Sequence, residues 1–591
     1  MSALKTEHTI ASYAVDLAVA LGAELAFTLT GGMAMFINRA VAVHPELQAV
    51  YCQHEQACVA AAEGYSKSKK FRAPGFAVVT AGPGVSNTIT SLISAYGDSV
   101  PMIVLAGQIK TNDIDSYGTR THGIQEIKSR EIITPCVKRF VRLEADNFRP
   151  VLIKTLVEMF SERPGPVFIE IPLDVQGVSI PDTAKDVADA AAEITRRVAE
   201  GSSTPAHRQA LVDCLRDLLR AKRPLIYVGN GCRVAGVEEA IGAFIARHQL
   251  PAVFSWLSFD IISARDDLHF GCPGGLAPIY ANEILGAADT ILFLGARLDL
   301  GTTAFQRDAF GHQAERYFVD IDPAELSKFD KFPEAHCIEA NLKALPAAIA
   351  SFIGSNSAAL PDWLPWCRDR RKTYLEEENS RLASTNMNVH GITDLLSAWS
   401  DNKVFVSASS GYAEETFTRF FVPGPDARFF NGAALGAMGM GLANALGAAF
   451  GTSQQVVCLE ADGGIMLNIQ ELATLSHYAP KGFVLIVFNN GGYESIRSSQ
   501  SRFFKDVNGA DADSGLYIPD FADLANAFKL RYVRIENLKD FSAQLSTFTA
   551  DAPPIMVDLI IDKFEYRGPA VKTVIDANGR PSSTPLREIT W

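Results

Sequence analysis

Two polar turns carry residues whose types and spacing suit a metal–anion site. Asp462 follows the apolar run 456–459, and Asn490 lies 28 positions later, after the apolar run 483–488. These side chains supply oxygen and neither sulfur nor imidazole. Such ligands suit Mg²⁺, an ion that usually completes its shell with phosphate oxygens. We therefore expect a metal–diphosphate site at these turns.

Strands and a helix must position the two turns. Both apolar runs are typical of buried parallel strands, and the segment between them predicts a helix. Its apolar residues recur at helical spacing, at Ile465, Ile469, Leu472 and Leu475. Gly463 and Gly464 begin this helix and are expected to leave bare N–H groups for an anion. Ligands of open α/β sheets bind at such carboxyl-end turns, although two Gly-rich turns also occur in ordinary strand–helix–strand units.

Length and composition bound the class of protein. The chain has 591 residues, a formal net charge of −13, 48% hydrophobic and 20% charged residues. These values indicate a multidomain globular protein and argue against a nucleic-acid partner. No apolar run reaches the roughly 18–20 residues that span a membrane, and the acidic segment 1–27 is not a signal peptide. The nine cysteines lack CxxC spacing, which predicts reduced thiols and a cytoplasmic location.

Alternating strand and helix patterns predict an α/β fold of three doubly wound parallel-sheet domains. The expected domains are 1–180, 200–355 and 365–560, followed by a C-terminal tail at 561–591. Segment 177–205 is rich in Ala, Asp, Glu and Ser and is expected to be a linker, as is 355–365. The tail either folds over the site or stays loose.

In the first domain, predicted strands end at polar or Gly-rich turns. These strands cover 26–29, 50–52, 75–80, 102–106 and 167–172. Gly32 follows the first strand, Glu55 the second and Gly82 the third. Glu55 opens an Ala-rich helix at 57–65, where little water is expected. Taken alone, it is most simply a helix-start carboxylate stabilised by the helix dipole.

Together these features resemble the thiamine diphosphate (ThDP) enzymes. Their signature is Gly-Asp-Gly followed by Asn-Asn at the spacing found here, although Ala461 replaces the first glycine. The resemblance implies that Asp462, Asn490 and the Gly492 carbonyl bind Mg²⁺. It also implies that Glu55, in its His-Glu-Gln setting, hydrogen-bonds N1′ of the aminopyrimidine and promotes removal of the C2 proton. That role needs a carboxyl kept partly protonated by burial.

The segments 95–101 and 107–108 resemble the acetolactate synthase branch of this family. That likeness implies a substrate-facing role for Gln125 and includes Gly32 in the catalytic set. His122 is a candidate acid or base, although a histidine in a loop is more often a plain surface residue.

The resemblance also assigns residues to cofactor binding. Gly82 and Asn87 belong to the expected pyrimidine-side loop. Met438 is expected to lie beneath the cofactor and force its V shape, with the Gly436 carbonyl at the pyrimidine edge. Without the motif, Met438 would be ordinary core filler. The other expected contacts are Ser409, Ser410, Gly463, Gly464, Tyr493, Glu494, Ser495 and Ile496.

The central domain of acetolactate synthases holds FAD, and two turns here resemble the FAD-contacting ones. They carry Arg297, Asp299 and Asp320. No complete GxGxxG fingerprint supports a dinucleotide. Two interpretations stay open: an FAD site, or a domain without a ligand as in other branches of the family.

The likeness covers nearly the whole chain and implies a carboligase that releases CO₂ from a 2-oxo acid such as pyruvate. Acetolactate synthases hold a second 2-oxo acid with an arginine whose position corresponds to Gly301 here. A carboxylate without its bidentate arginine binds poorly, which favours a ketone acceptor. Segments 117–126 and 488–504 most resemble enzymes that build branched deoxysugars of the yersiniose type. The expected acceptor is therefore a ketone, for which a 4-keto sugar nucleotide is one candidate.

Three alternatives stay open: an acetolactate synthase, a simple 2-oxo acid decarboxylase, and a non-catalytic regulatory subunit of the same fold. The intact Glu55, Asp462 and Asn490 speak against the last. Family sites form between the first domain of one chain and the last domain of another. The resemblance therefore implies a homodimer or homotetramer.

Overall fold

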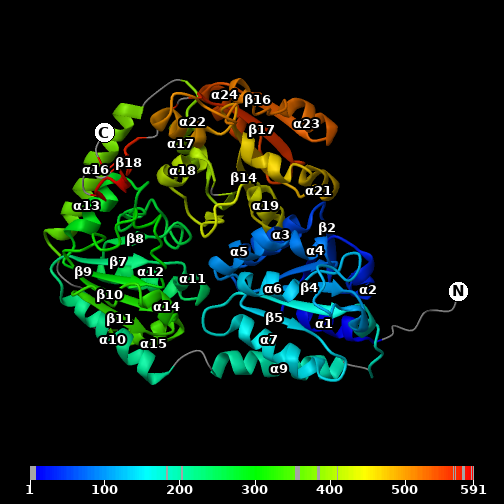
Figure 1. The fold of residues 1–591 in the computed structure, drawn as a ribbon. Coiled ribbons are helices and arrows are strands. Elements are labelled where there is room, and N and C mark those ends of the chain that lie inside the picture. Colours follow the sequence, from blue (N-terminus) through cyan, green and yellow to red (C-terminus); the bar gives the residue numbers. More distant parts are fainter. Residues whose placement is uncertain are drawn as a thin grey trace.

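The computed structural model contains three parallel β-sheets with their helices, and they occupy three corners of the molecule in Figure 1. It describes residues 8–181, 184–200, 204–352, 360–382, 386–408, 410–563, 565, 568–575, 579–586 and 589. The N-terminal domain is drawn blue to cyan, the central domain green, and the C-terminal domain yellow to red. The predicted fold class, three doubly wound parallel-sheet domains, is confirmed.

The N-terminal sheet has the strand order β2-β1-β3-β4-β6-β5. Its strands are β1 (Leu25–Thr28), β2 (Gln48–Tyr51), β3 (Gly75–Val79), β4 (Met102–Gln108), β5 (Arg139–Arg142) and β6 (Pro166–Pro172). Phe76 and Val78 of β3 pack into one apolar cluster, and Ala77 and Val79 pack into a second cluster. Since both faces of the sheet are covered, its strands are continuous apolar runs rather than alternating ones.

Helices cover both faces of this sheet. They are α1 (Ile10–Ala20), η1 (Gly32–Ala34), α2 (Met35–Val43), α3 (Glu55–Ser68), α4 (Pro83–Ser86), α5 (Ile89–Gly97), η2 (Thr111–Asp113), α6 (Ser129–Ile133), η3 (Thr134–Cys136), α7 (Phe148–Phe160), α8 (Leu173–Gln176) and α9 (Ala184–Glu200). The expected linker at 177–205 is wrong for its larger part, which is the helix α9. Its buried residues Val187, Ala190 and Ile194 recur at helical spacing and pack toward α1 and α7. The polar composition of the whole segment conceals this stripe, although its spacing is that of a packed helix.

The central sheet has the order β11-β10-β9-β7-β8. Its strands are β7 (Pro224–Val228), β8 (Ala252–Phe254), β9 (Thr290–Leu294), β10 (Glu315–Asp320) and β11 (Ala335–Glu339). Its helices are α10 (Pro205–Arg220), α11 (Gly231–Val234), α12 (Glu238–His248), α13 (Ile279–Ala287), α14 (Pro323–Leu326), η4 (Leu342–Ala344), α15 (Leu345–Ile349) and η5 (Ala350–Phe352). The turns after β7 and β9 meet, because the Gly231 N–H donates to the Gly295 carbonyl at 3.0 Å.

The C-terminal sheet has the order β13-β12-β14-β15-β17-β16. Its strands are β12 (Lys403–Ser407), β13 (Arg428–Asn431), β14 (Gln455–Ala461), β15 (Val484–Asn489), β16 (Arg531–Ile535) and β17 (Ile555–Ile560). Its helices are α17 (Val389–Trp399), α18 (Tyr412–Phe420), α19 (Met440–Gly451), α20 (Asp462–Ile465), η6 (Met466–Asn468), α21 (Glu471–Tyr478), α22 (Glu494–Phe503), η7 (Ala512–Ser514), α23 (Phe521–Ala527) and α24 (Leu538–Leu545). The helix before them in the chain, α16 (Trp363–Leu382), packs against α13 of the central domain. Because β12, β14 and β15 are neighbours, the turns that follow them share one edge of the sheet.

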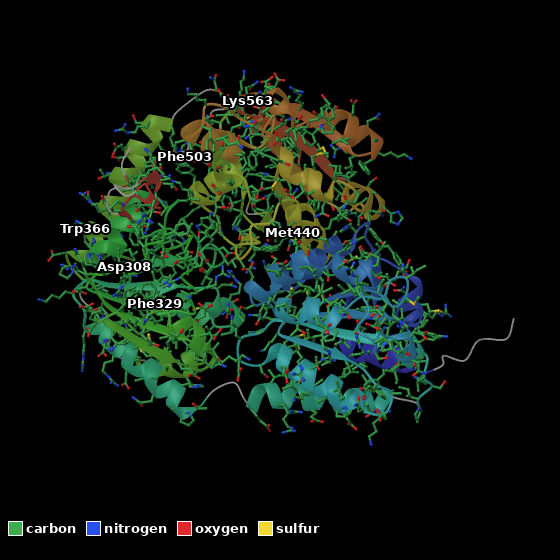
Figure 2. All side chains as sticks on the ribbon, viewed as in Figure 1. Asp308, Phe329, Trp366, Met440, Phe503 and Lys563 are labelled. Carbon is green, nitrogen blue, oxygen red and sulfur yellow. The ribbon has the colours of Figure 1, made fainter. Side chains whose placement is uncertain are left out.

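The N- and C-terminal domains are joined where α3 crosses α19. The backbones approach closely: a Cβ on Gly64 would lie 2.0 Å from the Asn444 carbonyl oxygen, and a Cβ on Gly447 would lie 1.8 Å from the Ala61 carbonyl oxygen. Figure 2 labels Met440, the first residue of α19, where these domains meet. The crossing therefore depends on glycine at both positions.

Replacing Gly64 with alanine is expected to destabilise this crossing by about 1–3 kcal/mol, because the added methyl overlaps a fixed carbonyl. The change should lower the melting temperature in a thermal unfolding scan. Gly286→Ala in α13 is the matched control, since its Cβ would meet nothing within 4 Å. The control should be neutral or slightly stabilising. Equal melting temperatures for both variants would contradict the crossing described here.

The described part of the C-terminal tail lies against two domains. Its two strands are β18 (Thr573–Ile575) and β19 (Pro581–Ser583), which pair antiparallel. Glu565 accepts a hydrogen bond from the Val389 N–H at 2.7 Å, at the start of α17. The Val571 N–H donates to the Gly275 carbonyl of the central domain at 3.0 Å. These contacts favour a docked tail over a loose one.

Two expectations from composition concern thiols and membranes. All nine cysteines are free thiols, and seven of them are buried, which is typical of small core residues. Within the described ranges, no helix combines the length and apolar character needed to cross a membrane.

Candidate active site

The Asp462 carboxylate lies fully buried at the carboxyl end of β14. Its Oδ1 accepts a hydrogen bond from the Gly463 N–H at 2.7 Å, and its Oδ2 accepts from the N–H groups of Asn490 at 3.1 Å and Gly492 at 2.8 Å. Burial raises the pKa of this carboxyl to about 6, and the N–H donors oppose the rise. One carboxylate therefore organises both of the turns noted in the sequence.

The Gly463 N–H is not bare, contrary to the expectation from sequence. It donates to the preceding carboxylate of Asp462, at the start of the short helix α20. Glycine is needed at this position for space, because a Cβ would lie 2.2 Å from the Tyr493 ring. At Gly464 a Cβ would lie 3.2 Å from Glu460 Oε2. These two glycines therefore serve close packing in this structure, and the anion contact expected of the Gly463 amide stays a prediction.

The second turn is tight and also depends on glycine. Gly491 and Gly492 have φ angles of 74° and 131°, which residues with side chains rarely adopt. A Cβ on Gly492 would lie 2.2 Å from the Ala510 carbonyl oxygen. In the described part of the chain, no three His, Cys, Asp or Glu side chains cluster to hold a metal. An ion bound by Asp462 and Asn490 would thus need further oxygens from its own ligand, as Mg²⁺ takes from phosphates.

Two buried hydroxyls lie at the same sheet edge. Ser410 follows β12, and Ser495 lies in the first turn of α22. Among the residues that the structure describes, neither Oγ atom has a hydrogen-bond partner. Because buried hydroxyls are normally paired, these two fit the oxygens of a diphosphate. Ser409 lies outside the described residues, Glu494 is buried and Ile496 is exposed.

The loop after β13 carries Gly436 and Met438. Gly436 has a φ angle of 61°, and the Met438 side chain is half-buried. The neighbouring Gly439 carbonyl accepts a hydrogen bond from Asn468 Nδ2 at 2.9 Å. This hydrogen bond ties the loop to η6, which follows Asp462 in the chain. The tie suits the role expected of Met438, which is to lie beneath a cofactor bound near Asp462.

Glu55 is the first residue of α3, and only 7% of it is exposed. Asn87 Nδ2 donates to Glu55 Oε2 at 2.9 Å, across the loop that begins at Gly82. A Cβ on Gly84 would lie 3.6 Å from Glu55 Oε1, so the backbone of this loop passes close to the second carboxyl oxygen. The structure therefore confirms the burial that sequence predicted for Glu55 and places Asn87 beside it.

Gln125, His122 and Gly32 are exposed in the single chain. Gln125 has a φ angle of 68°, and a Cβ on Gly82 would lie 2.6 Å from its carbonyl oxygen. His122 borders a cavity of about 370 Å³ that Met33, next to Gly32, also lines. The N-terminal candidates thus form one region around the Gly82 loop and this cavity.

The N-terminal and C-terminal candidates belong to different domains. Glu471, at the start of α21, accepts from the Gln53 N–H at 3.0 Å, two residues before Glu55. Gln56 Nε2 lies 3.5 Å from Met440 Sδ, the first residue of α19. Glu55 accepts a hydrogen bond from Asn87, whereas Asp462 accepts from the Asn490 N–H, so the two carboxylates have different hydrogen-bond partners.

Two further buried residues lie at this edge. Glu460 lies fully buried in β14, where its Oε1 accepts from the Leu442 N–H at 2.8 Å and burial raises its pKa to about 7. Arg497 is only 2% exposed and reaches the Asn490 turn. Glu460 escaped prediction, although an acid within an apolar strand was a signal for it.

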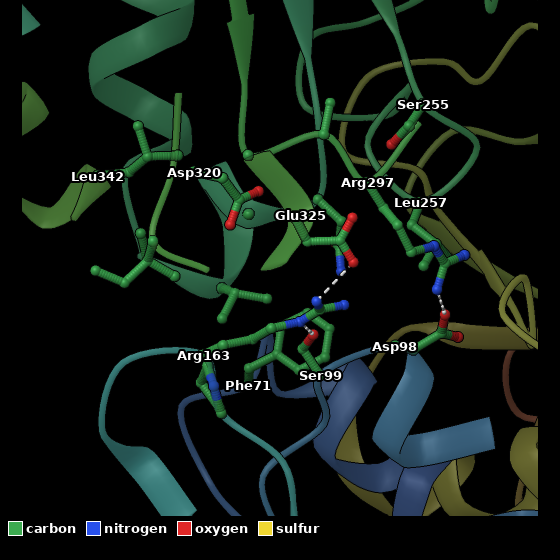
Figure 3. A pocket seen from close by; sticks show the side chains of 18 of the residues that line it. Phe71, Asp98, Ser99, Arg163, Ser255, Leu257, Arg297, Asp320, Glu325 and Leu342 are labelled. Atoms are coloured by element: carbon green, nitrogen blue, oxygen red, sulfur yellow. Dashed lines mark hydrogen bonds and ion pairs between the residues drawn. The ribbon is translucent and has the colours of Figure 1, made fainter. Parts of the chain in front are cut away.

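A cavity of about 850 Å³ lies between the N-terminal and central domains. Arg163 reaches across it to Glu325 at 2.8 Å, and Arg297 lies 3.7 Å from Asp98, as Figure 3 shows. The Tyr227 hydroxyl on its wall is buried and has no hydrogen-bond partner among the described residues. The volume falls in the range of small-molecule sites.

The comparison with protein families decides what these domains are. Residues 8–132 match the family described as "Thiamine pyrophosphate enzyme, N-terminal TPP binding domain", residues 211–345 its central domain, and residues 409–559 its C-terminal TPP binding domain. The chain belongs to the thiamine pyrophosphate enzyme family. Thiamine pyrophosphate is ThDP, and the two ThDP-binding domains carry Glu55 and Asp462 respectively.

This ThDP enzyme is of the acetolactate synthase type. It is 27% identical over 573 residues to acetolactate synthase 1, chloroplastic, of Zea mays, which covers 94% of this chain and 86% of that protein. It is 28% identical over 560 residues to the acetolactate synthase large subunit of Haemophilus influenzae, covering 92% of this chain and 93% of that protein. The Lactococcus lactis large subunit is 26% identical over 561 residues, or 93% and 92% of the two chains.

Proposed function

We propose that this ThDP enzyme releases CO₂ from pyruvate, or a similar 2-oxo acid, and transfers the acyl unit to a ketone acceptor such as a 4-keto sugar nucleotide. Bound ThDP would supply the nucleophilic carbon and the electron sink that decarboxylation needs. Decarboxylation and carboligation fit the acetolactate synthase type. The observation that carries the ketone acceptor is the environment of Gly301.

Gly301 is exposed beside a carboxylate. A Cβ there would meet only Asp299 Oδ1, at 3.4 Å. Asp299 Oδ2 accepts from Arg297 at 3.0 Å. Burial acts to raise the pKa of the Asp299 carboxyl, but the Thr302 amide and Arg297 together hold it below its usual range. Where the resemblance expects an arginine, the backbone therefore offers no cation, and Arg297 is already paired with Asp299. The carboxylate of a second 2-oxo acid would lack its bidentate partner here, whereas an acceptor without a carboxylate needs none.

Glu55 is proposed to hydrogen-bond the pyrimidine and to hold the proton that moves when the cofactor is activated. Its position at the buried start of α3 keeps water away from the carboxyl. The Asn87 amide fixes one carboxyl oxygen, which leaves Oε1 to face the ligand. Gly82, Gly436 and Met438 would complete the pyrimidine side.

Asp462, Asn490 and the Gly492 carbonyl are proposed to hold Mg²⁺. The unpaired hydroxyls of Ser410 and Ser495 would bind diphosphate oxygens, with Ser409, Gly464, Tyr493, Glu494 and Ile496 nearby in the chain. Gln125, His122 and Gly32 are assigned to the substrate side, because they border the Gly82 loop and the cavity beside it.

FAD is proposed for the large cavity of the central domain. The cavity is large enough for an elongated nucleotide, and Arg163, Arg297 and the Tyr227 hydroxyl supply donors on its wall. The purified protein is expected to carry flavin that denaturation releases and chromatography identifies. Protein that retains no flavin after incubation with excess FAD would favour the alternative, a central domain without this ligand.

A homodimer or homotetramer with sites between chains is proposed as the assembly. Pairs of strongly exposed apolar side chains beside the candidate site support it, since such neighbours often mark an interaction surface. Tyr117 and Ile124 near the substrate side are 79% and 91% exposed, and Phe503 and Phe504 at the end of α22 are 45% and 67% exposed. A partner's C-terminal domain would cover the first pair and its N-terminal domain the second. A monomer with full activity would contradict this assembly.

Competition between acceptors tests the proposed function. Full-length protein with ThDP, Mg²⁺ and pyruvate is incubated alone, with a simple ketone, and with a 4-keto sugar nucleotide, and products are identified by mass spectrometry. The proposal expects the adduct of the acetyl unit with the added ketone to dominate over acetolactate whenever that ketone is present. Acetolactate as the main product in all three mixtures would instead support an acetolactate synthase, the second candidate, which the relatives favour.

A further inference from the structure

Among the residues that the structure describes, Arg497 is the bulkiest fully buried side chain, and 2% of its surface is exposed. It lies in the first turn of α22, directly after the Asn490–Gly492 turn. Burying a guanidinium is costly unless its donors and charge are satisfied. Its contacts therefore show which structure it stabilises.

The guanidinium of Arg497 contacts the polar groups of the metal turn. Its Nη2 donates to the Asn490 carbonyl at 3.0 Å and to Asn490 Oδ1 at 3.3 Å, and its Nη1 donates to the Gly491 carbonyl at 3.2 Å. Asp462 takes the N–H groups of Asn490 and Gly492 from the other side. The turn is thus held by its amides through Asp462 and by its carbonyls through Arg497.

Arg497 also determines which way the Asn490 amide points. Guanidinium nitrogens only donate hydrogen bonds, so the Asn490 atom facing them must be the oxygen and not the NH₂ group. An amide oxygen has two lone pairs, and the arginine uses one. The other remains available to a cation, which the NH₂ group in the same place would repel.

The same guanidinium ties the turn to two further segments. Its Nη1 lies 3.9 Å from Asp511 Oδ2, and its Nη2 donates to the Lys563 carbonyl at 3.4 Å, where the tail begins. Tyr493 N–H donates to the Ala510 carbonyl at 2.7 Å. Arg497 therefore joins the turn, the segment before η7 and the start of the tail.

We propose that Arg497 is a positioning residue for the metal site: it presents the Asn490 oxygen and fixes the glycine turn, and so sets the metal affinity. The inference rests on the proposed metal–diphosphate site at Asp462 and Asn490. It adds a residue that affects metal affinity without being one of the proposed metal ligands. Groups that orient metal ligands in this way typically change metal affinity by about ten- to hundredfold when replaced.

The test measures Mn²⁺ binding, as a paramagnetic substitute for Mg²⁺, by electron paramagnetic resonance with full-length protein and ThDP. Arg497→Met is expected to weaken Mn²⁺ binding by about ten- to hundredfold. The Mn²⁺ affinity of Arg497→Lys should lie between those of Arg497→Met and the parent protein, because one ammonium cannot replace the planar guanidinium. Arg502→Met, an exposed residue of the same helix, is the matched control and should bind as the parent does.

A purely structural role for Arg497 would give a different result. It would lower the melting temperature but leave the Mn²⁺ affinity of the folded protein unchanged, and that outcome overturns the inference. If Arg497→Met does not fold, the measurement on Arg497→Lys decides. An Mn²⁺ affinity of Arg497→Lys equal to that of the parent protein would then overturn the inference. At saturating metal, kcat of Arg497→Lys should approach the parent value while the metal requirement rises.

Asp462→Asn separates this inference from the proposed site itself. If Asp462→Asn loses Mn²⁺ while both Arg497 variants bind normally, the site stands and the inference about Arg497 is wrong. If Asp462→Asn binds Mn²⁺ as the parent does, the proposed metal site is wrong, and the inference goes with it.

Discussion

Glu55→Gln is expected to lower the rate of CO₂ release from pyruvate by about 10²–10⁴-fold, the usual effect of removing a positioned acid or base. Glutamine keeps the shape of the side chain but cannot exchange a proton with the pyrimidine. The measurement is CO₂ release at saturating ThDP and Mg²⁺, together with ThDP affinity by calorimetry. The variant should fold normally, because Glu55 begins a helix whose packing is carried by other residues.

Glu239→Gln is the matched control for this prediction. Glu239 also lies in the first turn of a helix, α12, but is exposed and far from the proposed site in the chain. It should leave CO₂ release unchanged and affect stability only through the helix dipole. If Glu55→Gln released CO₂ as fast as this control, the role proposed for Glu55 would be wrong. A non-catalytic regulatory subunit of the same fold would then be favoured.

Gly301→Arg is expected to raise the yield of acetolactate from pyruvate alone by about tenfold, the effect of some 1.4 kcal/mol of added acceptor binding. An arginine there would offer two parallel donors to the carboxylate of a second pyruvate. The site admits a side chain, since a Cβ would meet only Asp299 Oδ1 at 3.4 Å and the backbone φ is not in the left-handed range. Product ratios by mass spectrometry, with and without a ketone, measure the change.

Two further substitutions at this position separate charge from size. Gly301→Lys should raise acetolactate less than arginine does, because an ammonium lacks the planar fork. Gly301→Ala should not raise it at all. An equal gain in the alanine variant, or a parent enzyme that makes only acetolactate, would show that Gly301 does not exclude the second 2-oxo acid.

The turns at Asp462 and Asn490 could be predicted from the sequence because the pattern that marks them is local. Buried parallel strands are continuous apolar runs, and β14 and β15 end directly before Asp462 and Asn490. Since both strands are neighbours in one parallel sheet, their carboxyl ends must meet. The burial of Glu55 followed in the same way from the Ala-rich helix that it begins.

The remaining features depend on contacts between distant segments. Arg497 is important because α22 folds back on the preceding turn, which no residue spacing announces. Gly463 leaves room for the Tyr493 ring, which lies against it from a later turn of the chain. The polar composition of the segment conceals helix α9, although Val187, Ala190 and Ile194 recur at the spacing of a packed helix.

The most direct test of the account is CO₂ release from pyruvate by the full-length protein, measured with and without ThDP, Mg²⁺ and a ketone acceptor. We expect release to require both ThDP and Mg²⁺. With an added ketone acceptor present, each CO₂ should be matched by one molecule of the acetyl adduct of that ketone, and not by acetolactate. If the protein with ThDP bound releases no CO₂ from pyruvate or from any other 2-oxo acid, the decarboxylating mechanism proposed for it is wrong.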